Sequence, residues 1–286
     1  MMKTYRAIYT PHGKAGEYAP FACNFYVGCS NGCLYCYLKQ GILAHALGGD
    51  KPVLKKCFKS EADAVSALEY DILHLRDSGL KESGLFMSFT TDPCLPDTIS
   101  LTYQAFRICM MMDIPFIILT KNADWVLGED YPQLFTRPDV PLYNHLCRPE
   151  NLDRCTVGFS LTRHDDYEPH ASINYNRVAA MSRLASHGVH TWASLEPVVD
   201  FNSSLDAISD SISICEHYKV GLMSGHHYDF TARELQLFVE TVIDRCRLGN
   251  STVYFKDSIT RLLSDKSVLN DPAVVPADGY RPFNPD

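Results

Sequence analysis

The chain has 286 residues, of which 46% are hydrophobic, 21% charged and 11% aromatic, so it can bury a sizeable core and is not a disordered chain. Its formal net charge of −8 comes from 26 Lys and Arg residues against 34 Asp and Glu residues. This balance gives no general attraction to nucleic acid phosphates or to an anionic membrane, so duplex DNA binding is not supported.

The N-terminal end carries basic residues that no apolar core follows, and no apolar run approaches the ~20 residues that span a bilayer. We therefore expect neither a signal peptide nor a membrane helix, and we expect a cytoplasmic protein. The 11 cysteines are an odd number. Because thiols stay reduced in the cytoplasm, metal binding or thiol chemistry is expected rather than a disulfide framework.

The first motif along the chain is a cysteine cluster. Cys29, Cys33 and Cys36 form a C-x3-C-x2-C run, with Gly28 just before it and Gly32 within it. Glycine adopts the positive φ of tight turns, so this short loop can aim several thiolates at one point. Soft thiolates select iron–sulfur clusters or zinc, whereas magnesium and calcium prefer oxygen ligands.

The spacing of this run leaves several occupants open. Structural zinc usually takes four ligands, and no second C-x2-C pair or H-x3-H pair follows the run. A plant-type ferredoxin differs by one residue in spacing but needs a fourth cysteine and a smaller chain. A cluster held by three thiolates, with one iron left open, explains three cysteines without a fourth. The remaining interpretation is three buried, reduced cysteines without metal.

Downstream of the cluster, hydrophobic periodicity predicts alternating strands and helices. Strands are predicted over residues 25–28, 85–89, 116–120, 157–161, 189–195, 220–223 and 252–255. Helices are predicted over 60–76, 98–112 and 123–135, then around Val178–Ala185, after the cap pattern Ser203-x-x-Asp206, and after Thr231-x-x-Glu234. The proline-containing segments 137–154 and 270–286 are predicted to be irregular.

Six strands are thus each followed by a helix, with one extra strand at the end. Such alternation indicates parallel strands with right-handed crossovers. We predict an α/β protein, a partial (β/α)6 TIM-type barrel with short irregular N- and C-terminal extensions; a doubly wound sheet is the alternative that periodicity does not exclude. One domain is expected over 1–286, with a barrel core over about 21–256 and a C-terminal extension over about 257–286.

Polar residues follow the predicted strands at the ends where chemistry gathers in barrels. Thr91 and Asp92 follow the second strand, Lys121 the third, and Ser160 lies near the end of the fourth. A hydroxyl and a carboxylate can accept hydrogen bonds from a cofactor ammonium group, and a lysine can bind a carboxylate. Glu196 ends the fifth strand, where it could bind ribose hydroxyls or a polar substrate. Ordinary turn chemistry and surface solvation are the alternatives for each residue.

The cysteine run resembles the hallmark of the radical S-adenosylmethionine (SAM) superfamily, which often has an aromatic residue just before the last cysteine. Tyr35 occupies that position, and the run from Gly28 to Tyr37 is most similar to the spore photoproduct lyase-like branch. The resemblance implies a [4Fe-4S] cluster on Cys29, Cys33 and Cys36, with Tyr35 and Tyr37 beside it.

That branch holds the methionine part of SAM with polar residues after strands two, three and four. The resemblance therefore places SAM against Thr91, Asp92, Lys121 and Ser160. It implies reductive cleavage of SAM by the cluster and hydrogen abstraction from an unidentified substrate, such as a nucleic acid base or nucleotide. It also implies an external electron donor similar to flavodoxin or ferredoxin.

Photoproduct lyase returns a hydrogen atom from a cysteine at the end of the second strand, where this chain has Phe89-Thr90-Thr91. Cys94 is displaced from that position and is, with Tyr37, only a candidate catalytic residue, so thymine-dimer repair is not carried over. His226 and His227 follow the sixth strand, as proton donors or as solvated loop residues. The competing class of function is a non-enzymatic metalloprotein, either an iron–sulfur electron carrier or a zinc-stabilised binding protein.

Overall fold

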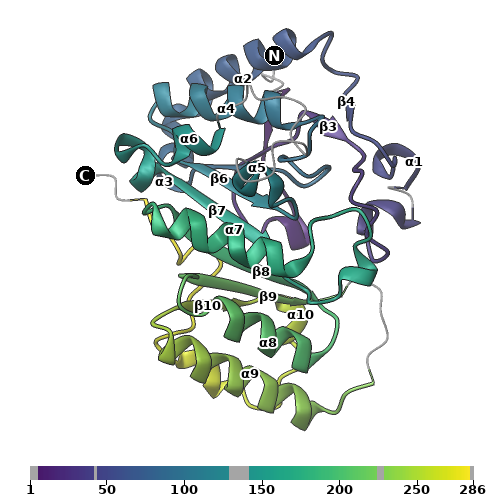
Figure 1. Cartoon of the computed structure of the whole chain (residues 1–286), viewed down its shortest axis with the longest axis vertical. Coiled ribbons are helices and arrows are strands. Elements are labelled where there is room, and N and C mark those ends of the chain that lie inside the picture. Colours follow the sequence, from purple (N-terminus) through teal and green to yellow (C-terminus); the bar gives the residue numbers. More distant parts are fainter. Residues whose placement is uncertain (1–5, 42–43, 129–141, 224–228, 284–286) are drawn as a thin grey trace.

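The structure is a computed structural model that describes residues 6–41, 44–128, 142–223 and 229–283. Its main sheet contains seven parallel strands (Figure 1). These strands are β2 (Ala22–Cys23), β5 (Leu85–Met87), β6 (Phe116–Thr120), β7 (Cys155–Ser160), β8 (His190–Val198), β9 (His217–Leu222) and β10 (Thr252–Phe255). An antiparallel strand, β1 (Ile8–Tyr9), extends the sheet beyond β2.

The parallel strands lie in the sheet in the same order as in the chain. A doubly wound sheet reverses its strand order near the middle, so this topology excludes that alternative. The described sheet has β1 at one edge and β10 at the other. The predicted α/β partial barrel is therefore confirmed.

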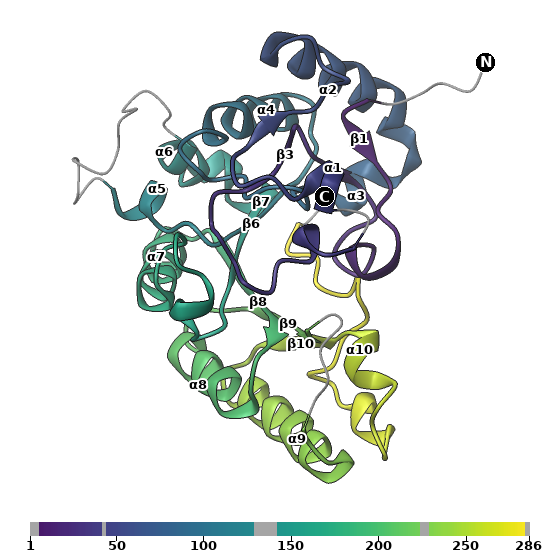
Figure 2. The same cartoon turned by 90° about the vertical axis from the view of Figure 1, so that its right-hand side faces the viewer.

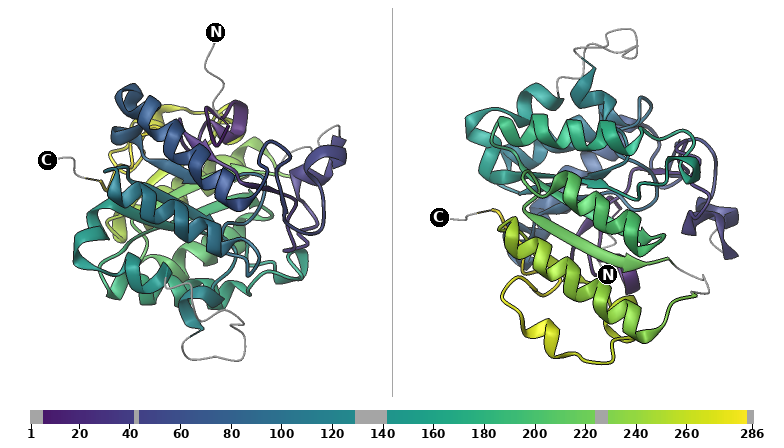
Figure 3. Two further views of the ribbon diagram at one scale, coloured as in Figure 1. Left: turned by 90° about the horizontal axis from the view of Figure 1, so that it is seen from above. Right: turned by 60° about the horizontal axis from the view of Figure 1, so that its bottom comes forward.

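Helices cover the outer face of the curved sheet, as Figure 3 shows from above and from below. The longer helices are α2 (Glu61–Leu75), α4 (Ile99–Met111), α7 (Asn174–Ser186), α8 (Phe201–Ser211) and α9 (Ala232–Leu248). The short ones are α1 (Ala44–Leu47), α3 (Lys81–Ser83), α5 (Asp124–Leu127), α6 (Leu142–Leu146) and α10 (Asp257–Thr260). No described helix combines the length and apolar character that crossing a membrane requires.

The central strands are covered on both faces, so every residue of β7 and of β9 is buried. Side-chain caps begin the covering helices α8 and α9. Thr231 and Glu234 form a capping box at α9, as their spacing predicts. At α8, however, the cap is Asp200, whose side chain accepts from the backbone N–H of Ser203.

The inner face of the sheet carries a small aromatic core. Phe86 and Trp192 pack there with Ala22, and Tyr18 packs against them. The indole of Trp192 lies over Gly158 on the neighbouring strand, where an added Cβ would be only 2.2 Å from a ring carbon. The N-terminal and C-terminal segments lie on this side of the sheet, opposite α7 and α8 (Figure 2).

Several predicted elements differ from the structure. The first barrel strand is not 25–28 but β2; β3 (Tyr26–Val27) pairs antiparallel with β4 (Val53–Leu54) in a separate sheet. The chain leaves the main sheet at Asn24. The side chain of Asn24 accepts a hydrogen bond from the backbone N–H of Phe89 and donates one to the hydroxyl of Tyr9. An apolar run does not reveal which sheet it joins.

The boundaries of other predicted elements also differ from those in the structure. Only α5 is found within the predicted helix over 123–135, of which residues 129–135 lie outside the described part. The predicted loop over 137–154 contains α6 and a 3-10 helix, η6 (Pro149–Arg154). The C-terminal segment has α10 and η8 (Ser267–Asn270), and a bridge from Val253 to Val274 ties it to the sheet.

Candidate cofactor site

A cavity of about 300 Å³ opens at the carboxyl ends of the parallel strands. It is lined by all three cysteines of the C-x3-C-x2-C run. The predicted cofactor contacts also line it: Tyr35, Thr91, Asp92, Lys121, Ser160 and Glu196. The cavity thus brings together residues from one loop and from the ends of four strands. Its size falls at the lower end of the range of small-molecule sites.

The cluster loop, which we define as residues 28–36, is shaped by its two glycines. Gly28 has φ +81°, and a Cβ there would be 2.4 Å from the carbonyl oxygen of Lys51. Gly32 has φ +69°, and a Cβ there would be 2.8 Å from the ring of His170. Only glycine allows both the turn and these close approaches, as the sequence predicted.

The thiols of this loop are held partly out of water. Burial, followed by the charge of Asp92, raises the pKa of Cys29 to about 12. Burial also raises the pKa of Cys33, while the nearby ammonium of Lys121 lowers it. Both thiols are therefore protonated at neutral pH, and a bound iron centre must displace these protons.

We tested whether the donor set fits an iron–sulfur cluster. Three soft thiols from one loop face one cavity, which is the donor chemistry such a cluster takes. Within the described ranges, no three His, Cys, Asp or Glu side chains are placed to hold a single metal ion. A cubane cluster attaches each thiolate to a different iron, so it does not need thiols that converge on one ion. The residues fit a [4Fe-4S] cluster.

The carboxylate of Asp92 joins three parts of the site. Its Oδ2 accepts from Asn31 Nδ2 at 2.9 Å and from the backbone N–H of Lys121 at 2.7 Å. Its Oδ1 accepts from Thr120 Oγ1 at 2.6 Å and from the backbone N–H of Cys94 at 2.9 Å. Four donors fill the acceptor sites of a carboxylate, so Asp92 ties the cluster loop to the ends of β5 and β6.

Two buried oxygen atoms in the cavity wall have no hydrogen-bond partner among the described residues. They are Thr91 Oγ1 and Asn31 Oδ1. A buried polar atom without a partner is unfavourable, which points to a ligand that supplies the missing donor. Thr91 thus offers a free acceptor beside the saturated carboxylate of Asp92.

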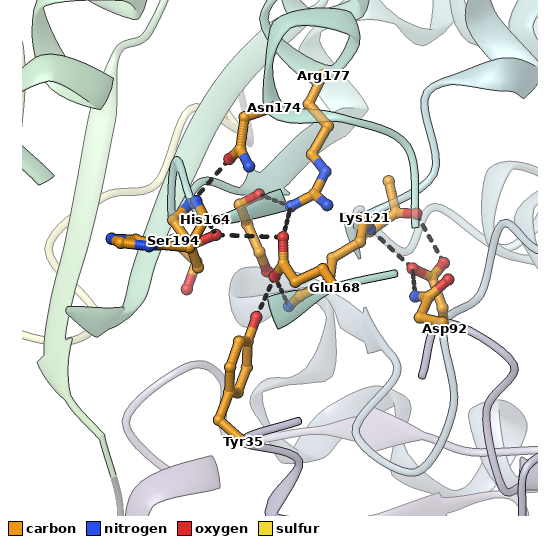
Figure 4. Close-up of polar contacts among 12 residues, drawn as sticks. Tyr35, Asp92, Lys121, His164, Glu168, Asn174, Arg177 and Ser194 are labelled. Atoms are coloured by element: carbon orange, nitrogen blue, oxygen red, sulfur yellow. Dashed lines mark hydrogen bonds and ion pairs between the residues drawn. The ribbon is translucent and has the colours of Figure 1, made fainter. Parts of the chain in front are cut away.

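An ion pair that the sequence reasoning missed lies behind the cavity wall. The side chains of Glu168 and Arg177 are both fully buried, with Arg177 Nη1 2.7 Å from Glu168 Oε2. The hydroxyl of Tyr35 donates to Glu168 Oε1, and Lys121 Nζ lies 3.7 Å from the same oxygen (Figure 4). Lys121 also lies 5.6 Å from the centre of the Tyr35 ring.

Glu196 belongs to a second polar group in the cavity wall. Its Oε2 accepts from the hydroxyl of Tyr18 at 2.6 Å and from Lys256 Nζ at 2.7 Å. Tyr18 OH also lies 2.7 Å from Ser194 Oγ. A glycine at position 221 permits this packing, because a Cβ there would be 2.8 Å from the side chain of Lys256. Tyr18 and Lys256 were not among the site residues predicted from the sequence.

The two candidate catalytic residues differ in position. Tyr37 lines the cavity, and its hydroxyl donates to the backbone carbonyl of Phe89. Cys94 is buried and is not among the residues that line the cavity. Burial raises the pKa of its thiol well above the usual range. His226 and His227 lie outside the described residues.

All 11 cysteines lie in the described part of the chain, and none forms a disulfide. Of the eight outside the cluster loop, Cys57 is exposed, Cys147 is half-buried and the others are buried. Outside the cluster loop the thiols are thus mostly buried.

Comparisons with known proteins were made for sequence and for structure. Neither a scan against protein-family models nor a search of curated proteins finds a match. Spore photoproduct lyase complexed with dinucleoside spore photoproduct is similar in structure, with a TM-score of 0.62 and 13% sequence identity over 89% of this chain and 81% of that chain. A variant of the lyase with bound AdoMet and the same dinucleoside gives a TM-score of 0.57, also at 13% identity, over 83% of this chain and 77% of that chain.

Streptococcus suis SuiB bound to S-adenosylmethionine gives a TM-score of 0.53 at 10% identity, over 87% of this chain and 51% of that chain. The chain has the fold of the radical SAM enzymes. At these identities the comparisons establish the fold and the arrangement of its elements. The comparisons therefore confirm the expected fold.

Proposed function

We propose that the chain is a radical SAM enzyme that holds a [4Fe-4S] cluster on Cys29, Cys33 and Cys36. The observation that carries this proposal is the shared cavity, in which three thiols of one loop face polar residues from the carboxyl ends of four strands. A bound, reduced cluster would supply the electron for reductive cleavage of SAM, and this chemistry would allow hydrogen abstraction from the substrate.

The protein's own residues bind and orient the cofactor. Lys121 binds the SAM carboxylate, and Thr91 accepts from its ammonium group through the unpartnered hydroxyl. Asp92 holds the cluster loop and the end of β6 in place and adds a negative charge near the ammonium. Ser160 and Tyr35 also line the cavity, and Lys121 Nζ lies 5.6 Å from the centre of the Tyr35 ring.

Glu196 forms a separate polar group with Tyr18 and Lys256 in the cavity wall. We assign this group to the ribose hydroxyls of SAM or to a polar group of the substrate. A carboxylate that already accepts from Tyr18 and Lys256 still has acceptor capacity on its other oxygen. Tyr37 and Cys94 remain candidates for hydrogen transfer, and of these two only Tyr37 lines the cavity.

For the substrate we propose a nucleic acid base or nucleotide. The lyase structure with a TM-score of 0.62 contains a dinucleoside. A structure of SuiB bound to a precursor peptide is less similar, with a TM-score of 0.54 and 11% identity over 84% of this chain and 49% of that chain. Phe89 and Tyr37 present aromatic rings in the cavity wall, on which a base can stack.

The proposed electron donor is an external flavodoxin- or ferredoxin-like protein. The cluster loop lies at the surface, since Leu34 beside Cys33 is 70% exposed. A redox partner can therefore approach the loop directly. We also propose that 1–286 acts as one domain, because a single large hydrophobic cluster runs from Ala7 to Ala273.

The test is anaerobic reconstitution with iron and sulfide. We expect a broad visible iron–sulfur absorbance that is lost when Cys29, Cys33 and Cys36 are all replaced by alanine. With SAM and dithionite, the reconstituted protein should form 5′-deoxyadenosine. The matched control replaces the exposed Cys57 instead, which should leave the absorbance unchanged.

Three outcomes would contradict the proposal. Survival of the absorbance in the triple variant would remove the cysteines from the cluster site. Zinc at one equivalent, without iron or sulfide, would identify a zinc-stabilised binding protein. A reconstituted cluster that forms no 5′-deoxyadenosine would identify an electron carrier.

A further inference from the structure

We propose that Glu168 is a positioning residue that sets the ammonium of Lys121 for the SAM carboxylate and fixes the cluster loop beside it. This inference rests on the proposed function, because it names the role of a buried residue toward the same cofactor. Glu168 does not line the cavity; it acts through Tyr35 and Lys121, which do.

The two carboxylate oxygens of Glu168 face different partners. Oε2 accepts from Arg177 Nη1 at 2.7 Å and from Thr162 Oγ1 at 3.2 Å, both of which are buried behind the cavity. Oε1 faces Tyr35 and Lys121 (Figure 4). The pair with Arg177 therefore neutralises the buried carboxylate and anchors one oxygen, which leaves the other directed at the cofactor side.

The distance from Glu168 to Lys121 has a consequence for binding. At 3.7 Å the ammonium is attracted to Oε1, but the separation exceeds hydrogen-bond length. Lys121 is thus held in place without a hydrogen bond to Glu168. Its N–H groups can point toward the carboxylate of SAM, while the negative charge behind it restrains its long, flexible side chain.

The segment that carries Glu168 also forms backbone hydrogen bonds with the cluster loop. We call residues 165–172 the clamp loop; it begins with the 3-10 helix η7 (Asp165–Tyr167). The backbone N–H of Leu34 donates to the carbonyl of Tyr167 at 2.9 Å, and that of His170 donates to the carbonyl of Asn31 at 3.1 Å. Glu168, which accepts from Tyr35, lies between Tyr167 and His170 in the chain.

The clamp loop reaches the lysine as well. The backbone N–H of Ser172 donates to the carbonyl of Lys121 at 3.1 Å, and the Ser172 carbonyl accepts from Arg177 Nε at 2.7 Å. One segment therefore ties the thiolate-bearing loop and the carboxylate-binding lysine to the same buried ion pair.

The experiment measures binding of two ligands to the reconstituted protein by calorimetry. SAM has the carboxylate that Lys121 would bind, whereas 5′-deoxy-5′-methylthioadenosine lacks the whole amino-acid part. For Glu168→Gln we expect SAM to bind about 10- to 100-fold more weakly, the usual effect of losing a supporting partner, and methylthioadenosine to bind as in the wild type. The matched control is Glu150→Gln, the same change at an exposed position.

The outcomes separate a positioning role from a structural one. Equal weakening of both ligands would mean that Glu168 only maintains the fold and would overturn the inference. Unchanged SAM affinity would overturn it too. If the wild type binds no SAM at all, the proposed function fails instead, and the clamp itself is then tested on the protein without cluster.

That second test uses Tyr35→Phe, which removes the bond to Glu168 without leaving a buried charge unpaired. It also serves if Glu168→Gln does not fold. Amide hydrogen exchange should become faster across Asn31–Cys36 and stay unchanged in α9, which is far from the loop in the chain. Unchanged exchange in the cluster loop would refute the clamp.

Discussion

Gly158 gives the sharpest test of how the barrel interior is packed. Replacement by alanine would place a Cβ 2.2, 2.5 and 2.6 Å from three carbons of the Trp192 ring. Carbon atoms in contact lie about 3.5–4.0 Å apart, so the indole must move by more than ~1 Å. Trp192 is only 2% exposed and packs against Tyr18 and Phe86, so a shift of the indole disrupts this aromatic packing.

The expected magnitude combines two opposing effects. Overpacking of a tight core costs up to about 3 kcal/mol. Alanine also reduces the conformational freedom of the unfolded chain, which stabilises the folded protein by up to about 1 kcal/mol. We therefore expect Gly158→Ala to lower the free energy of unfolding by about 2 kcal/mol. Urea unfolding followed by circular dichroism measures this difference.

Two further variants make the measurement decisive. Gly49→Ala adds the same methyl group where the nearest atom would be 3.7 Å away, and it should change stability by less than about 0.5 kcal/mol. In a Trp192→Phe background the smaller ring leaves room for the methyl, so the effect of Gly158→Ala should fall below about 1 kcal/mol. Equal effects in both backgrounds, or no effect in the wild type, would refute the packing argument.

Three other predictions concern ionisation, ligand binding and thiol reactivity. Burial, and then the charge of Lys256, lowers the pKa of Lys219 from 10.5 to about 7. Between these pH values the unfolded chain binds more protons than the native chain, so the wild type becomes more stable as the pH rises. We compare the free energy of unfolding of the wild type with that of Lys219→Met in urea titrations, and we expect the difference to rise by about 2 kcal/mol from pH 7 to pH 9. A difference that does not change with pH would contradict this prediction. Thr91→Val should change the free energy of unfolding of the apoprotein by less than about 1 kcal/mol, because the hydroxyl has no hydrogen-bond partner among the described residues. Calorimetry should nevertheless show weaker SAM binding by this variant, and an unchanged affinity would exclude the contact. Iodoacetamide should label the exposed Cys57 of the native apoprotein long before the buried Cys94, as peptide mass spectrometry would show, and equal rates would argue against this burial.

The features that the sequence predicted correctly are local ones. Gly28 and Gly32 lie within five positions of the cluster loop, and both adopt the positive φ that the loop was expected to need. The capping box at α9 spans four residues, and the periodicity of α2 and α4 repeats within each helix. Each of these signals depends on neighbours in the chain, which a sequence displays directly.

The ends of successive parallel strands are a partly local feature. Once strands are predicted in alternation with helices, their carboxyl ends must meet at one edge, and this brings Thr91, Lys121, Ser160 and Glu196 to one cavity. The first strand was misplaced for the opposite reason. Residues 22–23 and 26–27 are all apolar, and only the partner strand decides which of them enters the main sheet.

Tertiary structure alone decided which charges support the site. Glu168 follows Tyr35 by 133 positions, and Lys256 follows Glu196 by 60, yet both pairs are in contact. An acidic residue in a polar loop has the sequence signature of a solvated surface residue. It becomes a buried anchor only because the fold brings Arg177, Tyr35 and Lys121 around it, and a buried carboxylate is stable only with such partners. The sequence determined which donor groups the cluster loop carries, and long-range packing determined the residues that hold that loop in place.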